Sequence, residues 1–183
     1  MSEGSESFVC AACGQTHPGL PMDSAFQLPD IVWAIPESER ASRARWTTDL
    51  CQFGERYFIR CLLQVPFTAR DGCYAWGAWA EVPWPTFKRY LDLYDKDATD
   101  EARVEGVLAN DLPTYGGTIG LPVLLQFQTA KLRPTLHFAA GAQHQLGRET
   151  ELGISDARLH EILVAHGHIP DEPREQSRAG VRA

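Results

Sequence analysis

Residues 56–67 read RYFIRCLLQVPF, and the alternation within this stretch decides the fold class. Every odd position from Tyr57 to Val65 is apolar, whereas the polar residues Arg60 and Gln64 occupy even positions. Side chains of a strand point alternately to its two faces, so this pattern is typical of a half-buried β-strand. We therefore predict a strand over this stretch, with its odd positions in the core.

A second strand is predicted at Cys73–Val82, which reads CYAWGAWAEV. The residues ARDG precede it, and a turn signal of this kind between two strand patterns favours a hairpin. Gly77 lies between Trp76 and Trp79, and a glycine inside a strand marks either a bulge or the close approach of another backbone. An antiparallel hairpin is thus the expected centre of the sheet.

Three helices are predicted outside the hairpin, at Glu37–Thr47, Pro83–Tyr94 and Gly153–His168. Helix formers after a proline indicate the first, and apolar residues at steps of three and four indicate the other two. Ser155 is the expected N-cap of the last helix. In the second helix, the stripe expected to face the core consists of Trp84, Phe87, Leu91 and Tyr94.

Further strands are predicted at Glu105–Asn110, Pro122–Gln128 and Pro134–Ala140, the last two as an antiparallel pair. Strand pairs interleaved with helices indicate an α+β fold, in which helices pack on a mostly antiparallel sheet. We expect a disordered N-terminus at 1–7, a single α+β domain at 8–169 and a flexible tail at 170–183. The domain begins with a segment that resembles a zinc knuckle, within residues 8–51.

Charge and composition exclude several classes of protein. The 183 residues carry a net charge of −7, with 24 acidic and 17 basic side chains, which argues against a nucleic-acid partner. No apolar run approaches the roughly 20 residues of a membrane span. The start MSEGSESF lacks the pattern of a secretory signal, so we expect a cytoplasmic protein. The chain has five cysteines, and this odd number argues against a framework of disulfide bonds.

Residues 10–17 read CAACGQTH and carry the spacing of a zinc knuckle. Two thiols three positions apart can point at one metal ion around a tight turn, and Gly14 permits the left-handed backbone that such a turn needs. His17 follows, and Cys51 is the next thiol along the chain. We therefore predict a structural Zn²⁺ site with Cys10, Cys13, His17 and Cys51 as its ligands.

Alternatives to this site remain open. The fourth ligand is His17, His144 or a water molecule, and the paired thiols also fit a redox motif or two incidental cysteines. Bringing Cys51 to the knuckle closes a loop of 37 residues, which costs about 3 kcal/mol. Structural zinc contributes about 10–16 kcal/mol in small peptides, so the energetics permit the site. Cys61 and Cys73 lie in strand patterns and are expected in the core.

Several segments together resemble a known bacterial family, in the order CAACGQTHPGLP, DLCQFGERYFIRCLLQVPF, WGAWAEV, LPTYGGTIGL, RPTLHF and LGIS. The family is the domain of unknown function 2199, and the resemblance extends over residues 8–166. It implies a bacterial, cytosolic protein and supports Cys10, Cys13 and Cys51 as family positions, but it implies no established activity. This chain departs from the family pattern at His144, where it reads HQL in place of His-Pro-Leu.

No catalytic motif stands out, because the chain lacks a nucleophile elbow, a Walker A loop and a zinc-protease pair of histidines. We therefore expect a zinc-stabilised binding or interaction module with a protein or small-molecule partner. The alternative is a small metalloenzyme or ligand-processing enzyme in which His137 and Asp49 or Asp111 act beside an aromatic pocket. Its expected lining is Trp76, Trp79, Trp84, Tyr74 and Tyr115.

Overall fold

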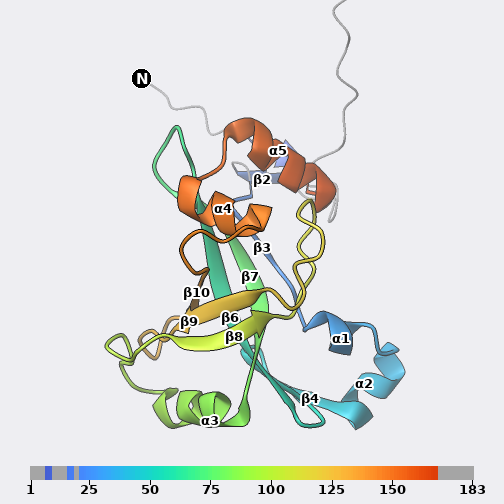
Figure 1. Cartoon of the computed structure of the whole chain (residues 1–183). Helices are drawn as coiled ribbons and strands as arrows, with labels where there is room; N and C mark the ends of the chain where they lie inside the picture. The colour runs from blue at the N-terminus through green and yellow to red at the C-terminus, as the bar shows by residue number, and fades with distance from the viewer. Residues whose placement is uncertain (1–6, 10–15, 19–20, 169–183) are drawn as a thin grey trace, which may run out of the picture.

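The computed structural model describes residues 7–9, 16–18 and 21–168 of the chain (Figure 1). Its central element is the hairpin of β6 (Arg56–Pro66) and β7 (Cys73–Val82), which pair antiparallel along their whole length. The predicted hairpin is therefore confirmed. So is its burial pattern, because Ile59, Cys61, Leu63 and Val65 of β6 are all completely buried.

Shorter elements surround this hairpin. The other strands are β1 (Ser7–Val9), β2 (Thr16–Pro18), β3 (Asp23–Ala25), β4 (Ala44–Trp46), β5 (Leu50–Phe53), β8 (Val104–Leu108), β9 (Pro122–Gln126) and β10 (Thr135–His137). The helices are α1 (Asp30–Trp33), α2 (Glu37–Arg43), α3 (Trp84–Leu93), α4 (Gln145–Leu152) and α5 (Asp156–Ala165). Among the described residues, no helix is long and apolar enough to cross a membrane.

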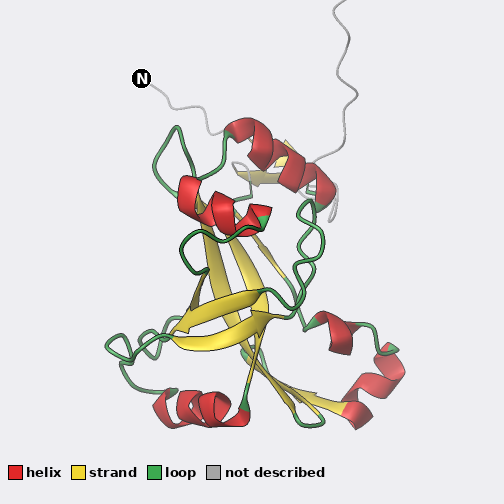
Figure 2. Ribbon diagram, in the orientation of Figure 1, coloured by secondary structure: helices red, strands yellow, loops and turns green. Residues whose placement is uncertain are grey.

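Five strands close into a barrel, in the order β6-β7-β8-β9-β10 and back to β6 (Figure 2). The α+β class is confirmed, but the expected simple antiparallel sheet is wrong in its shape. β10 reaches the free edge of β6 and pairs with it in parallel, which closes the sheet on itself. β3 also pairs in parallel, with β7. Both pairings join segments far apart in the sequence, which local patterns do not specify.

The length of the hairpin lets each of its strands have two outer neighbours. The first half of β6 pairs with β5, and the second half pairs with β10. The first half of β7 pairs with β3, and the second half pairs with β8. The barrel therefore continues into a separate arm, in which β5 and β4 extend the sheet toward α2 (Figure 1).

Two apolar cores lie on opposite faces of the hairpin. The larger core fills the barrel and continues to α3, α4 and α5. The smaller core lies beneath α1 on the other face, and it contains Leu28, Val32, Ala44, Cys51, Phe58, Trp79 and Ala109. Because β6 and β7 alternate between these cores, both faces of the hairpin are buried over part of their length.

Two glycines are required by close approaches between strands. A Cβ atom on Gly77 would lie 2.9 Å from the Cβ of Ala25 in β3, which confirms the close backbone approach expected at this position. A Cβ atom on Gly106 in β8 would lie 2.9 Å from the carbonyl oxygen of Glu81 in β7. The chain therefore packs β3 and β8 against β7 at points where a side chain does not fit.

The helices agree with the sequence patterns only in part. α5 is capped by Ser155, whose hydroxyl accepts a hydrogen bond from the Arg158 amide, as expected. The predicted helix at Glu37–Thr47 ends at Arg43, because the chain turns there into the edge strand β4. In α3 the buried residues are Phe87 and Tyr90.

The apolar stripe predicted for α3 is consequently wrong. Of its four members only Phe87 is buried, whereas Trp84, Leu91 and Tyr94 are exposed. Trp84 sits at the start of the helix and packs its ring on Tyr57 from outside the core, with ring centroids 4.9 Å apart. The helix lies on β6 through the Phe87 and Tyr90 face instead, so its orientation is rotated from the expected one.

Several predictions fall on parts of the chain that the structure does not describe. Residues 1–6 and 169–183, which make up nearly all of the predicted disordered ends, lie outside the described residues. The segment 10–15, with Cys10 and Cys13, also lies outside them. The zinc-knuckle-like segment therefore stays a prediction.

Candidate functional site

A cleft of about 590 Å³ opens between α4 and the outer face of the barrel. β10 contributes Thr135 and His137 to one wall, and Gly147, Thr150 and Glu151 of α4 form the opposite wall. The remaining lining residues include Gln64, Pro66, Cys73, Arg103, Phe138 and Ala139. We refer to this space between α4 and the barrel as the α4 cleft.

The strand β10 presents a hydroxyl and an imidazole side by side in the α4 cleft. Thr135 and His137 are two positions apart, so they share one face of the strand, while Leu136 between them is buried in the barrel. The Thr135 Oγ1 lies 2.9 Å from the His137 Nε2, and the Gln128 amide donates to the same hydroxyl over 3.3 Å. The contact between Thr135 and His137 is compatible with either imidazole tautomer, because a hydroxyl that accepts from Gln128 can still donate to Nε2 or accept from it.

The electrostatics of the cleft keep His137 uncharged. Burial, and then the positive charge of Arg103, lower the pKa of His137 below its ordinary value of 6.5. Arg103 itself is exposed and forms no ion pair with any residue that the structure describes. The cleft thus combines the guanidinium of Arg103 and the carboxylate of Glu151 with neutral hydrogen-bonding groups and apolar walls.

The lowered pKa of His137 predicts a specific dependence of stability on pH. The unfolded chain takes up a proton on this imidazole below about pH 6.5, whereas the folded chain takes it up only at lower pH. Protonation therefore favours unfolding, and the free energy of unfolding is expected to fall as the pH drops through this window. Urea unfolding at about pH 7.5 and about pH 5.5 measures the loss, which should be smaller in His137→Gln. An equal loss in both proteins would assign it to other groups.

Close packing and a side-chain cap hold the helix α4 over the cleft. Leu146 is fully buried in the main core, and a Cβ atom on Gly147 would lie 2.5 Å from the Cβ of Ala142, so the helix packs tightly on the loop before it. His144 caps the helix: its Nδ1 accepts from the Leu146 amide, and its Nε2 lies 3.0 Å from the carbonyl oxygen of Gly116. Both ring nitrogens of His144 are therefore engaged, with the proton on Nε2.

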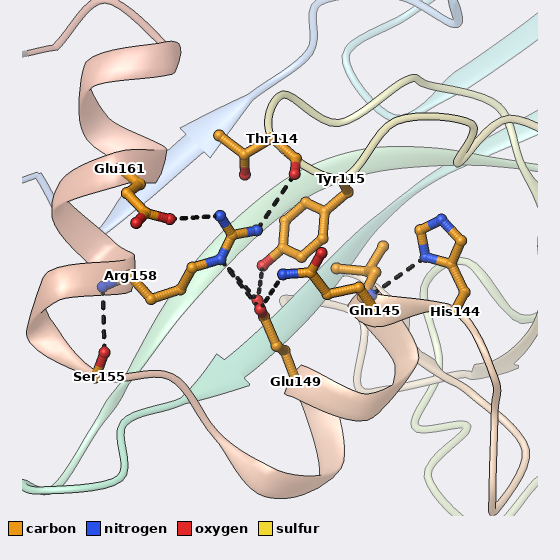
Figure 3. A network of polar contacts seen from close by, with 9 residues as sticks. Thr114, Tyr115, His144, Gln145, Glu149, Ser155, Arg158 and Glu161 are labelled. Carbon is orange, nitrogen blue, oxygen red and sulfur yellow. Dashed lines mark hydrogen bonds and ion pairs between the residues drawn. The ribbon is translucent and has the colours of Figure 1, made fainter.

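A polar network fastens the far side of α4 to α5 and to the loop after β8 (Figure 3). At its centre Glu149 accepts hydrogen bonds from the Tyr115 hydroxyl over 2.6 Å, from Gln145 over 2.7 Å and from the Arg158 Nε over 3.1 Å. Burial and the hydrogen bond to Glu149 raise the pKa of Tyr115, so its hydroxyl remains a donor. Arg158 also lies over the Tyr115 ring and bonds Glu161. This network fixes the wall of the cleft.

The structure does not bring Cys51 to β1 and β2, the two strands that flank the N-terminal cysteine segment. Cys51 lies in β5 directly opposite Trp46 of β4, and β4 lies beside α2 at one end of the molecule (Figure 1). His17 lies in β2, at the opposite end of the molecule in Figure 1. Only 1% of Cys51 is exposed, and burial among apolar side chains raises the pKa of its thiol to about 12. Cys51 is packed as a core residue.

The other candidate metal ligands are placed as follows. Cys10 and Cys13 are outside the described residues, and of His17 only the backbone is described. His144 caps α4, where its two nitrogens already have partners. Within residues 7–9, 16–18 and 21–168, no three His, Cys, Asp or Glu side chains form a group that could hold a metal ion.

The aromatic pocket expected for an enzyme is not formed by the predicted residues. Trp76 and Trp79 are fully buried in the two cores, and Trp84 lies half exposed on α3. Asp49 is bonded to Arg133 over 2.6 Å, and Asp111 accepts from the Thr118 amide. His137 alone of the proposed catalytic residues lines the α4 cleft.

Sequence patterns missed most of the cleft. The T-x-H spacing of Thr135 and His137 inside a strand does place both side chains on one face, and this signal was available. Arg103 and Glu151 come from segments that meet β10 only when the barrel closes. Their position depends on tertiary pairing rather than on any local motif.

Comparison with known proteins identifies the family and nothing more specific. The search of curated proteins gave no match, and the search of solved structures gave none either. The match to a family, by contrast, covers most of the chain, including the barrel and α4, and ends before α5. Residues 9–154 match the model of one family. The chain therefore belongs to this family, which is described as an uncharacterized protein conserved in bacteria (DUF2199).

Proposed function

We propose that this chain is a bacterial cytoplasmic binding module that holds a small ligand with an acidic group in the α4 cleft. The observation that carries the proposal is the exposed guanidinium of Arg103, which has no ion-pair partner among the described residues and lies at a cleft that also presents Thr135, His137 and the carboxylate of Glu151. An arginine binds a carboxylate through two parallel hydrogen bonds, so an acidic ligand would supply the ion-pair partner that Arg103 lacks among the described residues.

The chemistry of the lining supports binding more than catalysis. A neutral His137 carries one donor and one acceptor nitrogen, while Pro66 and Phe138 offer apolar contact to the rest of a ligand. A volume of about 590 Å³ is within the range of small-molecule sites. Thr135 engages the Nε2 of His137, so this nitrogen already has a hydrogen-bond partner within the protein.

A titration with matched small molecules tests the proposal. Small carboxylic acids and their primary amides are added in pairs to the full chain, and the backbone amide resonances are followed by NMR. The acids are expected to shift resonances of β10 and α4, and the corresponding amides are expected to have little effect, because only the acid pairs with Arg103. Equal effects of acid and amide, or shifts confined to other elements, would contradict an anion-selective cleft.

We further propose that the N-terminal segment binds a structural zinc ion through Cys10, Cys13 and His17. Two cysteines at knuckle spacing followed by a histidine are the residue types that zinc prefers. The backbone of β2 pairs His17 with Phe8 of β1, so the two strands that flank the cysteine segment lie side by side. A bound zinc would stabilise this short two-stranded sheet.

Metal analysis of the purified chain checks the zinc proposal. The expected content is about one zinc ion per chain, and Cys13→Ser should lower both the zinc content and the free energy of unfolding. Cys73→Ser and Cys51→Ala should keep the zinc, because Cys73 lines the α4 cleft and Cys51 lies in the smaller core. Cys51→Ala should still cost about 1 kcal/mol through lost packing. Equal zinc loss in all three variants would contradict the assignment.

A further inference from the structure

A second groove crosses the outer surface of the barrel over β7, β8 and β9. It encloses about 640 Å³ and meets the α4 cleft at Ala139, which lines both. Its floor is apolar: Pro83, Val107, Pro122 and Leu124 lie on the surface, and the core residues Val82 and Val123 lie beneath them. We call this space the acidic groove, because its polar lining side chains are the carboxylates Glu55, Glu81 and Glu105.

Two of the three carboxylates in the acidic groove lack a counterion. Glu81 is neutralised by Arg56, whose Nε and Nη2 donate to its two oxygens over 2.8 and 2.5 Å. Glu55 and Glu105 are exposed, and neither forms an ion pair with any residue in the described part of the chain. The groove therefore carries uncompensated negative charge above an apolar floor.

The register of the strands places charged and apolar side chains next to one another. Glu81 of β7 lies opposite Val107 of β8, and Glu105 of β8 lies opposite Leu124 of β9. All four side chains face outward, because they line the groove while the intervening positions point into the barrel. A ligand on this surface would therefore contact carboxylates and apolar side chains that lie next to one another on neighbouring strands.

We propose that the acidic groove docks an extended segment of a partner protein that carries lysine or arginine side chains beside apolar ones. The free carboxylates select cations and repel nucleic acids and anionic lipid surfaces. The net charge of −7 attracts basic partners from a distance and disfavours a second copy of this acidic chain. The apolar floor can bury apolar side chains of the partner, and a simple polyamine has no such side chains.

Fluorescence anisotropy with short labelled peptides tests this site in the full chain. The probe alternates lysine and leucine, and two matched peptides replace either lysine by glutamate or leucine by serine. The lysine–leucine peptide is expected to bind, and each replacement should weaken binding at least about tenfold. Spermine as competitor should displace the peptide only at much higher concentration.

Matched charge variants of the protein decide whether the groove is the binding surface. Glu55→Gln with Glu105→Gln should weaken peptide binding at least about tenfold, and Val107→Thr should weaken it as well. Glu37→Gln with Asp100→Asn removes the same charge from exposed positions elsewhere and should change binding less than about twofold.

Three results would overturn the proposal. Equal weakening by both double variants would show a non-specific charge effect, provided that thermal melting shows each variant to be folded. Equal affinity for spermine and the peptide would assign the groove to small polycations. A dimer in solution that dissociates in the Glu55→Gln, Glu105→Gln variant would assign it to a second copy of the chain.

Discussion

Replacing Glu149 by alanine is expected to lower the free energy of unfolding by about 3 kcal/mol, the loss typical of breaking a largely buried ion pair. The side chains of Glu149 and Arg158 are each only 15% exposed, so solvent weakly screens the ion pair between them. The substitution leaves the guanidinium of Arg158 and the hydroxyl of Tyr115 in this environment without their shared acceptor. Urea unfolding of the wild-type and variant proteins measures the difference.

Glu161 supplies a matched control for this experiment, because it bonds the same arginine from an exposed position. Its side chain is 60% exposed, and an exposed ion pair contributes only about 0–1 kcal/mol. Glu161→Ala should therefore cost less than about 1 kcal/mol, and Tyr115→Phe, which keeps the ring beneath Arg158, should cost about 1 kcal/mol. Equal losses for Glu149→Ala and Glu161→Ala would show that the network does not hold α4 in place.

The second large effect is expected for Gly106→Val in β8, which should lower the free energy of unfolding by about 2–3 kcal/mol through overpacking. The added side chain would start 2.9 Å from the carbonyl oxygen of Glu81, and 3.1 Å from the Cγ1 of Val82. Neither backbone can yield without disturbing the pairing of β7 with β8, which is one of the links that close the barrel. Chemical unfolding gives the loss, and near-ultraviolet circular dichroism reports the packing of the tryptophans.

The neighbouring position tests whether this effect depends on the close approach. Glu105 lies on the outer, exposed face of the same strand, so Glu105→Val adds a β-branched side chain where there is space. Its stability should change by less than about 0.5 kcal/mol. If Gly106→Val were as stable as Glu105→Val, the contact between β7 and β8 would not be needed for closure of the barrel.

The parts of the fold that local patterns specify could be predicted from the sequence. The β6–β7 hairpin follows from strict alternation around a turn, and α5 follows from the Ser155 cap with apolar residues at helical spacing. Closure of the barrel could not be predicted, because it depends on β10 meeting β6 across more than sixty residues of chain. Similarly, α3 has aromatic residues on more than one face, and only its packing on β6 selects Phe87 and Tyr90 as the buried pair.

Cysteine spacing constrains the positions of neighbouring thiols much more than those of distant ones. Cys10, Cys13 and His17 are close in sequence, so a short turn suffices to bring them together. Cys51 is only the next thiol along the chain, and no local pattern links it to the others. The structure shows that its strand belongs to the arm formed by β4 and β5 and that its thiol packs beside Phe58 and Trp79.

The function of the α4 cleft is tested most directly by the affinity of an acidic ligand for Arg103 variants. Isothermal titration calorimetry compares the tightest-binding acid of the NMR panel with the wild-type protein, Arg103→Gln and Arg45→Gln, an exposed arginine on β4. Arg103→Gln is expected to weaken binding at least about tenfold, and Arg45→Gln less than about twofold. Equal affinity of the wild-type protein and Arg103→Gln would contradict the assignment of the cleft as the binding site for an acidic ligand.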